Sequence, residues 1–276
     1  MSDSTIPNVV IPAKPPSTLS EILATQGRVI IALFLRETRT RFGSSILGYS
    51  WAILDPGFMI ATWAGLFHLM GHHPPIAASP VEFLVSGVLP ILLYRDVTNQ
   101  LTHAITANRA LLQFPIVHNY DVILARAILE LASFFALYFL ASAIFFVIDL
   151  QFWPAHPLEV LAVIGTLWLY AFGMGSINAV MACIFHSWGK LVPWYNRVVY
   201  MISGVFFLPE TMPKFAQDVI WVFPTAHLLS WMREATFSQF ETRFLSPDYV
   251  YACTLVALFT GLALERAFRR KISIEQ

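Results

Sequence analysis

Charge is scarce in this sequence of 276 residues. Only 12% of the residues are Asp, Glu, Lys or Arg, whereas a soluble globular domain carries about 25%. Hydrophobic residues reach 57%, and the mean hydropathy is +0.64. This composition excludes a disordered chain, a collagen-like chain and an ordinary soluble enzyme, so the apolar residues must be packed in lipid. The formal net charge is zero, which gives no indication of nucleic-acid binding.

Residues that carry chemistry are also few. Cys183 and Cys253 lie in separate apolar runs, with neither metal-ligand spacing nor a disulfide framework. His72 and His73 are adjacent, with no carboxylate or cysteine at ligand spacing, so we expect a solvated pair rather than a metal site. No G-x-S-x-G or H-E-x-x-H motif occurs. The sequence therefore predicts no catalytic residue and no bound metal.

A nucleotide-binding loop is missing as well. A Walker A motif reads G-x-x-x-x-G-K-[ST], but the pair Gly189-Lys190 is followed by Leu191 and lacks the upstream glycine. We therefore expect that this chain is not an enzyme and binds no cofactor. If transport is driven by ATP, the ATPase that holds ATP and magnesium is another polypeptide.

Long apolar runs dominate what is present. A transmembrane helix needs roughly 20 mostly apolar residues, and six stretches of uneven quality qualify: 48–71, 81–101, 122–148, 158–185, 191–208 and 249–268. The pattern predicts an all-α integral membrane protein with six transmembrane helices. Small residues in the fourth stretch permit close helix approach, within the subunit or across a dimer: Ala171, Gly173, Gly175 and Ser176.

The basic residues predict the orientation. With six spans, both termini lie on one side, and that side with the adjoining span ends holds 14 of the 17 Lys and Arg residues. The positive-inside rule then places both termini in the cytoplasm. The first 16 residues lack the basic and apolar regions of a signal peptide. We expect a flexible tail over 1–16, an amphipathic helix over 17–43, a six-span domain over 44–271 and a C-terminal tail over 272–276.

Two segments outside the spans have patterns of their own. Thr18 and Glu21 form a Thr-x-x-Glu capping box that predicts a helix start, and the helix that follows is too charged to span, so we expect it to lie in the cytoplasmic interface. The external segment 209–248 carries two short apolar pieces broken by prolines. These pieces predict two re-entrant or interfacial half-helices, and the residues assigned to this external gate are Pro209, Pro213, Pro224 and His227.

Charges within the spans are costly in lipid and suggest function by default. Arg126 and Glu130 are spaced i, i+4, which predicts a structural ion pair on one helix face. Arg95 and Asp96 are sequential, so we expect them to point apart and to have separate partners. Asp55-Pro56 is interpreted as a helix cap with proline at the first helical position.

Several strings together carry a family resemblance. They are RETRTRFG at 36–43, LGYSW at 47–51, ANRALL at 107–112, FP at 114–115 and SGVFF at 203–207. They resemble the inner-membrane permease of bacterial capsular-polysaccharide ABC exporters, in the ABC-2 class, and the resemblance spans about residues 19 to 271. It implies a homodimer bound to two copies of a cytoplasmic ATPase. It also implies export of a lipid-linked acidic polysaccharide across the bacterial inner membrane, with a periplasmic co-polymerase or adaptor and an outer-membrane export channel as partners.

The resemblance also suggests which segment docks on the ATPase and where the substrate enters. The cytoplasmic loop 102–120 is the predicted coupling segment that docks on the ATPase, through Asn108, Arg109, Leu112, Phe114 and Pro115. Positive potential would attract a polyanion at the cytoplasmic entrance. The basic residues proposed for the substrate path are Arg36, Arg39, Arg41, Arg95 and Lys190. The aromatic residues proposed for it are Tyr49, Trp51 and Trp194, for which an interfacial belt is the simpler interpretation.

Three alternatives remain open at this point. The same machine with another cargo would be an O-antigen or teichoic-acid exporter permease. An ion-coupled secondary transporter would be expected to show paired broken helices in both halves, whereas one broken region is seen here. An intramembrane lipid- or glycosyl-transfer enzyme would need a convergent carboxylate, histidine or metal cluster, and none stands out. Strict dependence on a separate ATPase separates the exporters from the other two classes.

Overall fold

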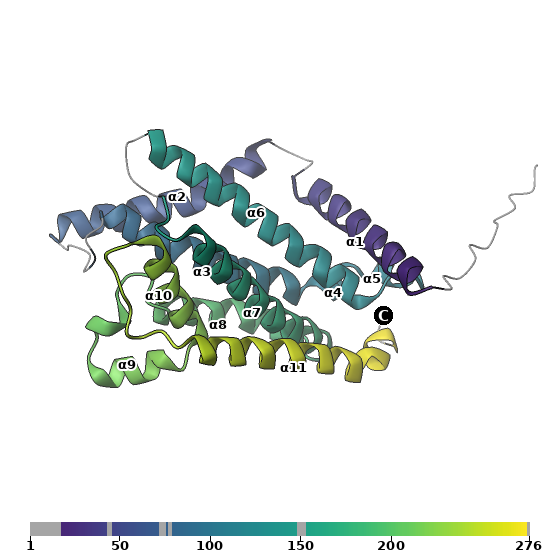
Figure 1. The fold of residues 1–276 in the computed structure, drawn as a ribbon. Helices are drawn as coiled ribbons and strands as arrows, with labels where there is room; N and C mark the ends of the chain where they lie inside the picture. The colour runs from purple at the N-terminus through teal and green to yellow at the C-terminus, as the bar shows by residue number, and fades with distance from the viewer. Residues whose placement is uncertain (1–17, 43–45, 72–75, 77–78, 148–152, 275–276) are drawn as a thin grey trace, which may run out of the picture.

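The described part of the chain is helical throughout. The computed structural model describes residues 18–42, 46–71, 76, 79–147 and 153–274, which contain α-helices, one 3₁₀ turn and no strand. The elements in chain order are α1 (Leu19–Phe42), α2 (Ile46–Leu69), α3 (Pro80–Thr102), α4 (Ala104–Ala107), α5 (Arg109–Leu112), α6 (Asn119–Val147), α7 (Pro157–Ile184), α8 (Trp188–Ile202), η1 (Pro209–Thr211), α9 (Lys214–Trp221), α10 (Pro224–Thr236) and α11 (Pro247–Ile274). They form one elongated bundle (Figure 1).

Helix α3 is the centre of this bundle. Every residue from Phe83 to Tyr94 is buried, as expected for a helix that is apolar on all sides. It contacts α2, α6, α7, α8 and α10. A complete capping box fixes its start, because the Ser79 hydroxyl accepts from the Glu82 N–H and the Glu82 carboxylate accepts from the Ser79 N–H.

Helices α7 and α11 lie side by side because glycine allows it. A Cβ built on Gly173 would lie 2.7 Å from the backbone of Ala257 and Leu258 in α11, and one on Gly261 would lie 2.9 Å from the Ser176 Cβ. On the other side of α7, a Cβ on Gly175 would meet the Leu101 side chain of α3 at 2.8 Å. These small residues therefore serve packing inside the subunit.

This close approach leads to a stability prediction. Gly173→Ala is expected to lower the free energy of unfolding by about 1–3 kcal/mol, because the added methyl must push the α11 backbone away. The matched control is Gly165→Ala in the same helix, where a Cβ meets nothing within 4 Å, and which should be neutral or slightly stabilising. Thermal unfolding of both purified variants measures the difference. Equal thermal midpoints of the two variants would show that α11 can move away from α7 without loss of stability.

Three helices in the described residues are long and apolar enough to cross a membrane: Asn119–Val147, Pro157–Ile184 and the Pro247–Arg269 part of α11.

Two expectations from the sequence about helix boundaries need correction. Pro56 lies inside α2, which already begins at Ile46, so Asp55-Pro56 does not cap this helix. The helix expected over 191–208 runs instead from Trp188 to Ile202, because Gly204 adopts a φ of +79° and turns the chain.

The two ends of the bundle differ. The start of α1, the short helices α4 and α5 and the end of α11 gather at one end, while η1, α9 and α10 lie at the opposite end (Figure 1). Two short helices, α9 and α10, occupy the segment where half-helices were expected, with Pro213 immediately before α9 and Pro224 as the first residue of α10. Helix α10 packs against α3, α7 and α11 and is buried along most of its length.

Candidate functional site

The predicted coupling segment is two single-turn helices with an exposed outer surface. Asn108 separates α4 from α5, and a turn through Pro115 follows α5. Arg109 and Pro115 are exposed, and Phe114 and Ile116 keep 59% and 51% of their surface. Exposed apolar side chains beside a cation are typical of a protein-docking surface. Leu112 is half-buried and packs against the core.

Asn108 differs from its neighbours because it is buried and holds three elements together. Its Oδ1 accepts from Arg36 Nη1 at 2.7 Å, and its Nδ2 donates to Glu37 Oε1 at 3.1 Å and to the Ala104 carbonyl at 3.0 Å. Arg126 of α6 donates from Nε to the same Glu37 oxygen at 3.2 Å. The predicted coupling segment is therefore held to α1 and α6 by a network of hydrogen bonds and one ion pair.

Two further polar contacts fix α1 along the first part of α6. Near its start, Gln26 Nε2 donates to Asp121 Oδ2 at 2.5 Å. The same Asp121 oxygen accepts the backbone N–H of His118 and so caps α6. At the other end of α1, Arg41 forms an ion pair with the buried Glu130. The helix that begins at the confirmed Thr18–Glu21 capping box is thus held at three points.

Both expectations about charges within the spans are wrong in their pairing. Glu130 pairs with Arg41, and Arg126 pairs with Glu37, so the ion partners come from α1 and not from the neighbouring turn of α6. Arg95 Nε and Asp96 Oδ1 lie 2.9 Å apart and pair with each other. Long side chains can fold back toward a sequence neighbour at the half-exposed edge of a helix, where the local geometry does not force them apart.

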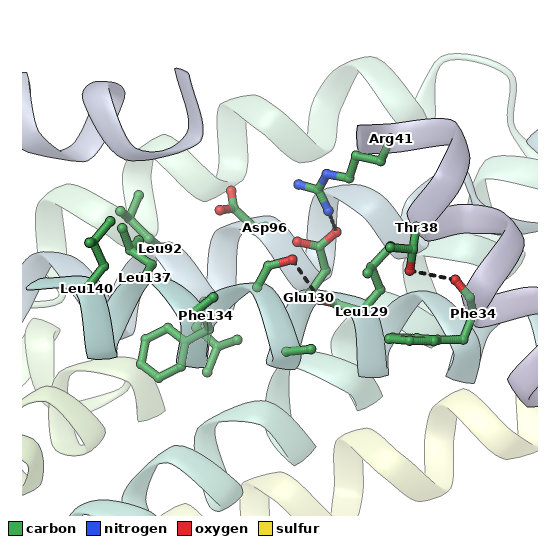
Figure 2. Close-up of a pocket in the computed structure, with 14 residues that line it drawn as sticks. Phe34, Thr38, Arg41, Leu92, Asp96, Leu129, Glu130, Phe134, Leu137 and Leu140 are labelled. Atoms are coloured by element: carbon green, nitrogen blue, oxygen red, sulfur yellow. Dashed lines mark hydrogen bonds and ion pairs between the residues drawn. The ribbon is translucent and has the colours of Figure 1, made fainter. Parts of the chain in front are cut away.

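The Arg41–Glu130 pair is part of the lining of a pocket of about 480 Å³. Helix α1 contributes Phe34, Thr38 and Arg41, α3 contributes Asp96, and α6 supplies most of the apolar wall. In Figure 2 the Arg41 guanidinium points to the Glu130 carboxylate and Asp96 faces the same space, while Leu137 and Leu140 lie on one side of these charges and Phe34 lies on the other. A few charged groups in an apolar wall fit an amphiphilic molecule.

A sequence profile of the ABC-2 type transporter family matches residues 28–237, which include both α4–α5 and this pocket. The chain belongs to the ABC-2 type transporter family. Three relatives of this ABC-2 protein have informative names. The polysialic acid transport protein KpsM of Escherichia coli is 34% identical over 85% of this chain and 91% of its own length. The capsule polysaccharide export inner-membrane protein CtrC of Neisseria meningitidis is 28% identical, over 91% and 95%. BexB of Haemophilus influenzae, with the same description as CtrC, is 28% identical, over 93% and 97%.

The structure spreads the predicted substrate-path residues of this ABC-2 protein over two regions. Arg36, Arg39 and Arg41 lie near the end of α1, where Arg36 binds Asn108 and Arg41 pairs with Glu130, while the exposed Arg39 contacts neither α6 nor the predicted coupling segment within the described residues. Lys190 and Trp194 are exposed on α8, where the Arg197 guanidinium lies 5.6 Å from the Trp194 ring centroid. The side chains of Tyr49 and Trp51 lie outside the described residues.

His227, predicted as part of an external gate, is a buried anchor of α10. Its Nδ1 accepts the Ser246 N–H at 3.3 Å, so Nε2 carries the proton and donates to the Trp221 carbonyl at 2.8 Å. The ring packs against Trp221, Phe244 and Tyr249. This cluster joins α9, α10 and the start of α11. Pro209 begins the 3₁₀ turn η1, and a gating role for these residues stays a prediction.

Arg233 is a buried charged residue that the sequence did not single out. It is fully buried in α10, donates from Nη2 to the Val205 carbonyl at 2.9 Å and from Nη1 to the Phe207 carbonyl at 3.1 Å, and lies 4.1 Å above the Phe83 ring. A basic residue directly after the apolar run His227–Met232 is the signal that could have revealed it. No group of three potential metal ligands occurs within the described residues.

Proposed function

We propose that this chain is the transmembrane permease of an ATP-driven exporter that moves lipid-linked acidic capsular polysaccharide across the bacterial inner membrane. One observation carries the proposal: relatives named as capsule polysaccharide export inner-membrane proteins align over 91–97% of both chains. The KpsM relatives, named for polysialic acid transport, favour an acidic polymer. The exposed surface of α4 and α5 supports the docking of a separate subunit.

The proposed assembly follows from the same considerations. Two copies of the chain, each with six spans and both termini in the cytoplasm, bind two copies of an ATPase that holds ATP and magnesium. A periplasmic co-polymerase or adaptor and an outer-membrane channel continue the path. The gathering of the start of α1, of α4–α5 and of the end of α11 at one end of the bundle supports a common cytoplasmic face for them (Figure 1).

Deletion of the gene in its native host tests this function. Surface polysaccharide should disappear and polymer should accumulate inside the cell, and expression of the wild-type chain should restore export. Immunoblotting of whole cells and of the cytoplasmic fraction measures both pools. Undiminished surface polysaccharide in the deletion strain would contradict the proposal.

Arg39 offers the clearest test of the proposed basic entrance. All three arginines are exposed, but Arg36 binds Asn108 and Arg41 pairs with Glu130, so replacing either of these two also removes a contact that holds α1 in place. Arg39→Gln is expected to reduce export about tenfold through lost attraction of the polyanion. The measurement is export per molecule of membrane-inserted chain.

Arg28→Gln is the matched control for Arg39. It removes the same charge from the same helix, at an exposed position nearer the start of α1, and so has the same effect on the positive-inside bias. If both variants export alike, or both lose insertion, the charge on α1 serves topology and the entrance is elsewhere.

A further inference from the structure

A second hollow extends the charged pocket along α6. It measures about 300 Å³ and lies between α2, α3 and α6. Leu137 and Leu140 line both hollows, so the two hollows adjoin at these side chains. Every described residue that lines the second hollow is apolar, including Ile60 of α2 and Leu89 of α3. We call the whole feature the α6 groove.

The charged residues that line the α6 groove are one cation, Arg41, and two anions, Glu130 and Asp96. Arg41 pairs with Glu130, and Asp96 pairs with Arg95, which does not line the groove. The side chains of Arg95 and Asp96 keep 35% and 38% of their surface, and Arg41 keeps 35%. A ligand head group at this point therefore meets both a guanidinium and a carboxylate. A polyanion finds no excess of positive charge here, in contrast to the outer face of α1.

The length of the groove corresponds to a hydrocarbon chain. From Glu130 in the charged part to Ile144 in the apolar part, α6 rises about 21 Å at 1.5 Å per residue, and both residues line the hollows. One leaflet of a bilayer core is about 15 Å thick. An acyl chain of one leaflet can therefore lie along the groove with its head group at the charged residues.

We propose that the α6 groove binds one zwitterionic membrane phospholipid, with the phosphate at Arg41, the ammonium at Asp96 and one acyl chain along Leu137 and Leu140. Charge complementarity decides the occupant, because a lining of one guanidinium and two carboxylates matches a head group that carries both a phosphate and an ammonium, and disfavours a head group that is only anionic. The bound chain lies against α2, α3 and α6, and its head group lies against α1. The lipid thus serves as a structural partner of α1, independent of the exported cargo.

Native mass spectrometry of the full chain, purified with its accompanying subunits and exchanged into mixed micelles of equimolar phosphatidylethanolamine and phosphatidylglycerol, tests this site. We expect one retained phosphatidylethanolamine per chain. Leu137→Trp fills the groove where its two parts meet and should lower retention about tenfold. Leu161→Trp is the control, since Leu161 of α7 is 53% exposed and lies outside both hollows.

A second variant tests the head-group contact separately. Asp96→Asn removes the partner of the ammonium while leaving the apolar groove intact, so it should keep a bound lipid but lose the preference for phosphatidylethanolamine over phosphatidylglycerol. Three results would overturn the proposal: equal retention of both lipids by the wild type, equal retention by Leu137→Trp and Leu161→Trp, or a retained mass that belongs to the lipid anchor of the polysaccharide. Folding of each variant is verified by size-exclusion elution.

Discussion

Arg109→Glu combined with Phe114→Asp is expected to abolish export while the chain still folds and inserts. Both side chains are exposed at the coupling segment, and Phe114 keeps 59% of its surface, so the change removes an apolar anchor and reverses a charge without opening the core. Anchors of this kind contribute about 2 kcal/mol or more to an interface, which weakens ATPase binding about 30-fold. Co-purified ATPase per chain, measured by quantitative mass spectrometry, reports the loss.

Two neighbours provide the controls for this double variant. Gln113→Ala, at an exposed position between the two replaced residues, should bind ATPase as the wild type does. Asn108→Ala should act differently, because Asn108 is buried and holds Arg36, Glu37 and Ala104. It should lower the thermal unfolding midpoint, which the exposed double variant does not. Normal ATPase binding by the double variant would remove α4–α5 from the docking surface.

Arg233→Met is expected to destabilise the far end of the bundle by about 2–4 kcal/mol. The change leaves the Val205 and Phe207 carbonyls without their guanidinium donor, and charge-assisted hydrogen bonds contribute about 1.5–3 kcal/mol each. Removing the buried guanidinium charge of Arg233 also removes its desolvation cost, which offsets part of this loss. The net effect destabilises the turn at Gly204, because Arg233 holds this turn close to Phe83 of α3. Chemical unfolding in detergent, followed by tryptophan fluorescence, measures the difference.

Arg243→Met provides the matched control, because Arg243 is an exposed residue of the same segment and its backbone N–H, not its side chain, binds Glu210. It should leave stability unchanged. Arg233→Lys should restore little, since one ammonium cannot reach two carbonyls and stack on the Phe83 ring at once. If Arg233→Met unfolds at the wild-type midpoint, the hydrogen bonds of Arg233 to the Val205 and Phe207 carbonyls do not stabilise this end of the bundle.

The parts of this structure that the sequence predicted are those specified by near neighbours in the chain. The Thr18–Glu21 capping box starts α1, and the prolines at 213 and 224 mark the beginnings of α9 and α10, as expected. Caps and proline act through the local backbone, so a window of a few residues contains the necessary information.

Ion-pair partners could not be predicted in this way. Arg41 and Glu130 are 89 residues apart, as are Glu37 and Arg126, and only the packing of α1 along α6 brings them together. The i, i+4 spacing predicted an ion pair between Arg126 and Glu130, because that rule considers only contacts within one helix. The burial of Asn108 among exposed neighbours and of Arg233 beneath the Gly204 turn likewise depends on contacts between distant segments. Tertiary contacts therefore decided the polar interior of this protein.

The most direct test of the central claim is affinity purification of the chain from its native membranes in mild detergent, with mass spectrometry of the bound subunits and an assay of ATP turnover. We predict one ATPase subunit per chain and steady ATP hydrolysis, both lost in the Arg109→Glu, Phe114→Asp variant. A chain that purifies alone, without turnover, would contradict the claim that this ABC-2 protein is the permease of an ATP-driven exporter, and would favour a secondary transporter or a membrane enzyme.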